Sequence, residues 1–120
     1  MGFFEVRHAG SWQGACEDLV AQLKQRGFYK GQVWSIDAHV NDPDGEAIIS
    51  VHWNGEPAGS YNNQAFIDFE ILNDTNSWDQ HYRWGDQRAD QLRRSGKRVI
   101  SLTHSNNCGG RGLTIIFFEH

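Results

Sequence analysis

A short pattern that occurs twice constrains the fold of this chain more than any other feature. The first copy reads Phe4-Glu5-Val6 followed by Ser11-Trp12, and the second reads Phe69-Glu70-Ile71 followed by Ser77-Trp78. Serine is a favoured residue at a helix start because its hydroxyl accepts a hydrogen bond from a free backbone amide of the first turn. Each copy therefore indicates a strand followed by the start of a helix.

Both helix starts lead into an apolar stripe that ends at a glycine. Glycine ends a helix readily because it adopts the left-handed conformation without steric cost, and Gly27 and Gly96 fit this role. Apolar residues at helical spacing predict the side of each helix that faces the core. The predicted stripes are Trp12, Cys16, Leu19, Val20 and Leu23 in the first helix and Trp78, Tyr82, Gly85, Ala89 and Leu92 in the second.

Residues 32–53 give the clearest hairpin in the sequence. Apolar residues alternate along both runs, and the segment between them is rich in Asn, Asp, Pro and Gly, which are favoured in turns. If Val40 faces Ala47, then Trp34 faces Trp53, and all the alternating apolar residues lie on one face. Because a shift of one residue would turn this set to the other face, the pattern predicts one register.

These elements predict an α+β fold built from a duplicated β-α-β-β unit, about 3–53 and 66–118, in a single domain over 1–120. Strand-helix-strand crossovers are right-handed, and we expect a pseudo-twofold axis to place both helices on one face of an antiparallel-rich sheet of about six strands. A curled sheet or half-barrel is the alternative. The topology is similar to the duplicated unit of the effector-binding, gyrase-inhibitor-like proteins. Because the similarity is one of element order, it implies no site residue.

Composition limits the partners that such a domain would bind. The chain has 11 Lys and Arg against 15 Asp and Glu, a net charge of −4, which argues against a nucleic-acid partner because phosphates require clustered basic residues. Cys16 and Cys108 lack the spacing of zinc or redox sites. No apolar run reaches the length of a membrane span, and no basic-then-apolar leader opens the chain. We therefore expect a cytoplasmic protein that has no membrane partner. The sequence contains no motif that indicates a cofactor or a metal, so we expect neither.

If both helices cover one face of the sheet, the opposite face is open and mixed in character. It would combine apolar side chains with carboxylates, whereas a solvated sheet face is mostly polar. A contiguous apolar patch often marks a binding surface, although scattered apolar residues are normal on protein surfaces. The apolar members are Phe3, Val33, Ile48, Ile116 and Phe118, and the acidic members are Glu5, Asp37, Asp68 and Glu70.

The leading hypothesis is a non-enzymatic domain that binds a small amphipathic or cationic ligand on this open face. Aromatic rings and carboxylates together suit a cation with an apolar body, and the repeat-related pair Glu5 and Glu70 is expected near the pseudo-twofold axis. Trp34 and Trp53 belong to the predicted core face and join the site only if the sheet curls. The predicted ligand-binding set is Glu5, Glu70, Trp34, Trp53, His39, His52 and Phe118.

Four alternatives remain open from the sequence. The open face would also suit a homodimer, and the acidic chain would suit an inhibitor or immunity-type protein that acts through this face or through Trp84. Asp37, His39 and His52 include the ligand types of a metal site, but diagonal strand neighbours are about 7–8 Å apart, so exposed strand histidines are the preferred interpretation. A hydrolase-like enzyme would use Cys108 and His104 as nucleophile and base.

Overall fold

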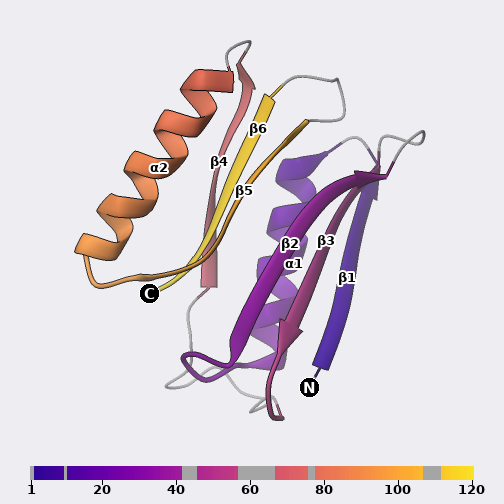
Figure 1. The fold of residues 1–120 in the computed structure, drawn as a ribbon. Coiled ribbons are helices and arrows are strands. Elements are labelled where there is room, and N and C mark those ends of the chain that lie inside the picture. Colours follow the sequence, from indigo (N-terminus) through magenta and orange to yellow (C-terminus); the bar gives the residue numbers. More distant parts are fainter. Residues whose placement is uncertain (1, 10, 42–45, 57–66, 76–77, 107–111) are drawn as a thin grey trace.

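The structure is a computed structural model that describes residues 2–9, 11–41, 46–56, 67–75, 78–106 and 112–120. It contains two helices and six antiparallel-paired strands, which confirms the α+β class and the β-α-β-β order of both halves (Figure 1). The elements are β1 (Gly2–Ala9), α1 (Trp12–Arg26), β2 (Val33–Asn41), β3 (Glu46–Trp53), β4 (Ile67–Thr75), α2 (Trp78–Arg94), β5 (Arg98–Asn106) and β6 (Gly112–Glu119).

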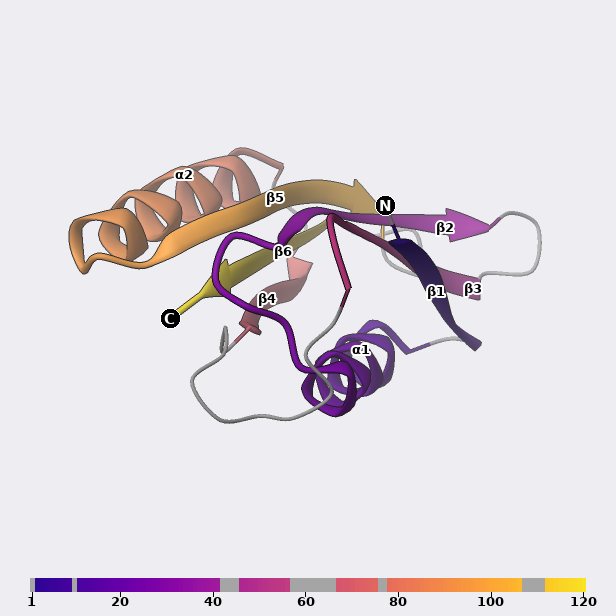
Figure 2. The same cartoon turned by 90° about the horizontal axis from the view of Figure 1, so that it is seen from below.

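The strands form two three-stranded sheets rather than one six-stranded sheet. The first sheet has the order β1-β3-β2 and the second has the order β4-β6-β5, so the last strand of each half is central. Strands β2 and β5 lie side by side where the sheets meet. They run in the same direction in both ribbon views (Figures 1 and 2), without belonging to one hydrogen-bonded sheet.

Helices α1 and α2 lie on opposite faces of the strand layer that the two sheets form. The prediction that both helices cover one face is therefore wrong. Leu92 of α2 shares a buried cluster with Ile116 of β6, whereas Leu19 of α1 shares the main core with Ile115 of the same strand. Neighbouring strand residues point to opposite faces, so β6 separates the helices. In Figure 1, α2 lies in front of the second sheet and α1 lies behind the first.

The direction of β2 and β5 explains this arrangement. Two similar units related by an axis perpendicular to a sheet would have antiparallel strands at their junction and both helices on one face. Neighbouring strands that run in the same direction imply instead a rotation about an axis along the strands, and such a rotation exchanges the faces. The right-handed crossover on which the prediction was based does not distinguish these axes, because both preserve it.

The match between the two Phe-Glu tripeptides is shifted by one residue relative to the fold. Phe4 precedes Trp12 by eight positions, but Phe69 precedes Trp78 by nine, and β4 contains an irregularity between Asn73 and Thr75. As a result Glu70, and not Phe69, lies on the face of the second sheet that is packed against α2. A one-residue shift exchanges the faces of a strand, so Phe69 points towards the main core.

Strand β6 is consequently buried on both faces. All residues from Leu113 to Glu119 are buried, and one side faces α2 while the other faces the core around α1. Figure 2 shows α1 on the inner side of the curved strand layer, where it contacts both outer strands, β1 and β4. The main buried cluster thus combines residues from both halves of the chain.

The predicted hairpin register is confirmed over most of its length. Val40 pairs with Ala47, and Ile36 pairs with Val51. The exception is Trp34, because an irregularity between Val33 and Ser35 places Val33 opposite Trp53. Trp34 is therefore turned out of the core and is 46% exposed, which corrects its predicted position.

The first helix follows its predicted pattern more closely than the second. Ser11 accepts a hydrogen bond from the Gly14 amide, and Gly27 ends α1 with a φ of 67°. In α2, His81 is fully buried and Tyr82 is 48% exposed, so the helix is rotated from the predicted stripe. Trp84, which the stripe omitted, packs against the Leu92 cluster. The predicted second N-cap, Ser77, lies outside the described residues.

Candidate functional site

One face of the first sheet is covered by neither helix, and it forms the candidate site. This outer face lies opposite α1 and beside the second sheet, and it is turned towards the viewer in Figure 1. Its members alternate with the core residues of the same strands, except at the irregularity in β2, where both Trp34 and Ser35 lie on this face. They are Phe3, Glu5 and Arg7 from β1, Trp34, Ser35, Asp37 and His39 from β2, and Ile48, Ser50 and His52 from β3.

Three aromatic side chains are grouped at one end of this outer face. The His52 ring lies 4.9 Å from the Phe3 ring and 5.4 Å from the Trp34 ring, measured between centroids. Phe3 is 53% exposed and Trp34 is 46% exposed. Nδ1 of His52 is buried without a hydrogen-bond partner among the described groups. We call Phe3, Trp34 and His52 the aromatic cluster.

The next cross-strand row carries two carboxylates. Glu5 and Asp37 both pair with Ser50, one from each side of the central strand. Asp37 accepts a hydrogen bond of 2.8 Å from the Ser35 hydroxyl. Glu5 lies 3.1 Å from Arg7, and this hydrogen bond is the main reason that the pKa of Arg7 is raised. Asp37 is thus the acidic group of this row that has no basic partner in the described part of the chain.

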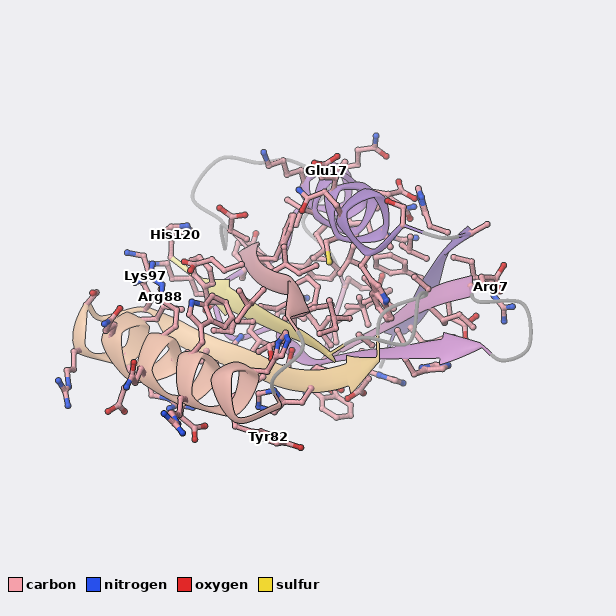
Figure 3. The ribbon with its side chains drawn as sticks, turned by 90° about the horizontal axis from the view of Figure 1, so that it is seen from above. Arg7, Glu17, Tyr82, Arg88, Lys97 and His120 are labelled. Atoms are coloured by element: carbon pink, nitrogen blue, oxygen red, sulfur yellow. The ribbon has the colours of Figure 1, made fainter. Side chains whose placement is uncertain are left out.

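The structure separates several residues that the sequence placed together. Glu5 and Glu70 lie on the outer strands of different sheets, so they do not meet near an axis. Glu70 instead accepts two hydrogen bonds from Arg88, of 2.6 and 2.7 Å, and these raise the pKa of Arg88. Figure 3 shows Arg88 on α2, far from Arg7 at the rim of the first sheet.

Two further aromatic residues of the predicted set are buried. Phe118 packs under α2 and is 4% exposed, because its face of β6 is the one that the helix covers. Trp53 is 6% exposed, and its ring centroid lies 5.1 Å from that of Phe28 and 5.7 Å from that of Phe4. Neither residue is available to a ligand on the outer face.

His52 and His39 remain on the outer face, but they are not neighbours. His52 pairs with Ser35, whereas His39 is opposite Ile48. Among the described residues, no three histidine, cysteine, aspartate or glutamate side chains are close enough together to hold a metal ion. The candidate nucleophile Cys108 lies outside the described residues.

His104 belongs to a second polar cluster, beneath the start of α2. Its Nδ1 lies 2.8 Å from the Thr114 hydroxyl, which is also 3.2 Å from Nδ1 of the buried His81. The Tyr82 ring meets the His104 ring edge-on at 4.5 Å, and Figure 3 shows Tyr82 at the solvent side of α2. Burial lowers the pKa of His104, and this effect outweighs the attraction of Asp86, while His81 lowers it further.

The lowered pKa of His104 predicts that the fold loses stability in mild acid. An unfolded imidazole has a pKa of about 6.5, so the unfolded chain takes up a proton before the folded chain does as the pH falls below this value. The contribution of His104 is complete above about pH 6.5 and declines as the pH falls towards its folded-state pKa. Urea unfolding of wild type and His104→Asn between pH 7.5 and 5 measures this. As the pH falls, the free energy of unfolding should decrease less for the variant than for wild type. A difference between the two that is independent of pH would contradict the prediction.

The predicted binding set did not include Phe3 and Asp37, although both were expected on the open face. The predicted hairpin register indicated part of this arrangement, because it placed His52 opposite Ser35 and Ser50 opposite Asp37, as observed. The position of Trp34 beside His52 depends on the irregularity in β2, for which the sequence pattern gave no indication.

Comparisons with known protein families, with curated proteins and with solved structures found no match to this chain. In the described part of the chain, neither helix has the length and apolar character required to cross a bilayer.

Proposed function

We propose that the protein is a non-enzymatic binding domain that holds a small amphipathic cation against the outer face of the first sheet. The observation that carries the proposal is the aromatic cluster, in which two large rings remain about half exposed around one imidazole. Aromatic faces attract cations, with a strength of about 0.5–2 kcal/mol per contact. The proposed site is narrower than the sequence suggested, because α2 covers the side of the second sheet that carries Glu70 and Phe118.

The acidic row gives the site its preference for positive charge. Adjacent rows on one face of a strand are about 7 Å apart, since each residue advances the strand by about 3.3 Å. A ligand whose apolar body contacts Trp34 can therefore place its charged group near Asp37. Glu5 contributes less, because Arg7 already neutralises part of its charge.

A comparison of equivalent positions in the two sheets supports a role for the outer face in contact with polar groups. Position for position, the pairing Phe3–His52 in the first sheet corresponds to Phe69–Phe117 in the second, where both rings face the core. The first sheet has His52 where the second has a phenylalanine. This face keeps aromatic surface but adds hydrogen-bonding groups, as in small-molecule sites that combine apolar surface with a few polar groups.

Calorimetric titration with benzyltrimethylammonium tests the proposal, with phenylacetate as an aromatic anion of similar size. We expect the cation to bind and the anion not to bind. Trp34→Ala should weaken the binding by about tenfold, equivalent to about 1.4 kcal/mol. Asp37→Asn should weaken it by about threefold, as expected for a solvent-exposed charge.

Matched controls use exposed groups that are not members of the outer face. Tyr29→Ala removes another exposed aromatic ring, and Asp90→Asn removes another exposed carboxylate. Neither change should alter the binding. The proposal is overturned if the cation fails to bind below millimolar concentration, or if Trp34→Ala binds as tightly as wild type.

A further inference from the structure

We propose that β1 pairs with β1 of a second copy of this chain, so that two first sheets join into one continuous sheet. This inference is independent of the ligand site. Strand β1 pairs with β3 on one side only, and on its other side it pairs with no strand of the described chain. An edge strand presents a row of backbone N–H and C=O groups that are ready to pair with another chain.

The position of α1 leaves room for this pairing. The helix lies on the inner side of the strand layer, between β1 and β4, and does not extend across the rim of the first sheet (Figure 2). Strand β1 is also the outermost strand of that sheet in Figure 1. A second copy would therefore meet backbone and strand side chains first.

Charge selects one register for the pair. Arg7 is at the rim of the sheet (Figure 3), and it shares the outer face with Glu5. In an antiparallel pair centred on Val6, Glu5 lies opposite Arg7 of the second copy, and the same pair recurs by symmetry. The registers shifted by two residues place Glu5 opposite Glu5 or Arg7 opposite Arg7. Like charges directly opposite each other destabilise a strand pair, whereas opposite charges stabilise it.

The contacts that Arg7 makes within one copy are compatible with its pairing to Glu5 of the second copy. Arg7 lies 3.1 Å from Glu5 and 3.2 Å from Glu46, and the Arg7 side chain is 53% exposed. It can rotate towards a second carboxylate without leaving a buried charge unpaired. Natural edge strands commonly carry charged side chains, especially lysine, that discourage pairing. On this edge Glu5 and Arg7 have opposite signs, so the edge is complementary to a second copy of itself.

Sedimentation-velocity and light-scattering measurements on the full chain test the dimer up to about 1 mM, because edge pairing buries less surface than a stable interface needs. We expect a concentration-dependent dimer. Arg7→Glu and Glu5→Arg should each weaken it by tenfold or more, and the double variant that carries both changes should restore it. Arg94→Glu, which reverses the charge of an exposed arginine on α2, should leave the dimer unchanged.

Three results would overturn the inference. A monomer at the highest concentration would exclude the dimer, and a dimer unaffected by Arg7→Glu would place the interface elsewhere. Failure of the double variant to recover, while circular dichroism shows that it is folded, would exclude the proposed register. None of these results depends on whether benzyltrimethylammonium binds.

Discussion

Replacement of Ile116 by alanine is expected to lower the free energy of unfolding by about 2–5 kcal/mol, the range for large aliphatic residues in a core. Ile116 is fully buried between β6 and α2, in the cluster with Leu92 and Phe118. Removing its side chain deletes apolar contacts and leaves a cavity that the helix can fill only in part. Urea unfolding followed by circular dichroism measures the loss.

The comparison with Ile115 makes this prediction specific to the fold. Ile115 is also fully buried, but on the opposite face of β6, so Ile115→Ala should cost a similar amount. Phe3→Ala, at a side chain that is 53% exposed, should cost much less. If both helices covered one face, only one of the two isoleucines would be buried. A large loss for Ile115→Ala with almost none for Ile116→Ala would therefore contradict the structure.

Replacement of Glu119 by alanine is expected to cost about 1.5–3 kcal/mol, the range for hydrogen bonds to a charged group. The Glu119 side chain is 5% exposed, and its carboxylate accepts hydrogen bonds from Arg98 and from the Gly31 amide. Arg98 also donates to the Val33 carbonyl, at 2.7 Å. This group of contacts connects the end of the second sheet to the start of β2.

The loss should be specific to this buried carboxylate. Asp90→Ala removes an exposed carboxylate that pairs with Arg94 one helical turn away, and such pairs contribute about 0.3–0.5 kcal/mol. Thermal or urea unfolding of both variants gives the comparison. If Glu119→Ala is no more destabilising than Asp90→Ala, the contact group does not hold the two halves together.

The local elements of this fold could be predicted from the sequence. Ser11 and Gly27 mark the ends of α1 by their own capping chemistry, and the pairing of Val40 with Ala47 follows from alternation and a turn-rich loop. These features depend on interactions between residues near one another in the chain. The order of helices and strands follows from them.

The arrangement of the two halves was not predicted, because the two copies of the Phe-Glu pattern differ by one residue in their spacing from the helix. The extra position before Trp78 moved Glu70 to the helix-bearing face, and the similarity of the two tripeptides hid this shift. The unbroken apolar run from Ile115 to Phe118 was a usable signal, since strands buried on both faces do not alternate. The candidate site differs accordingly from the predicted one, because Phe118 lies in the core and Trp34 lies at the surface.

Cysteine reactivity offers a further check on the core. Cys16 is fully buried on α1, and burial raises the pKa of its thiol to about 12. A thiol reagent should therefore modify Cys16 at the rate of global or local unfolding rather than at the rate of an exposed thiol. Rapid modification of Cys16 in the native protein would contradict the packing of α1.

Proton–proton nuclear Overhauser effects from the Leu92 methyl groups test most directly which face of β6 lies against α2. The structure predicts contacts from Leu92 to Ile116 and Phe118 and none to Ile115, which lies on the far side of the strand. Contacts from Leu92 to Ile115, without contacts to Ile116, would place both helices on one face. That result would contradict the fold and the assignment of the ligand site to the first sheet.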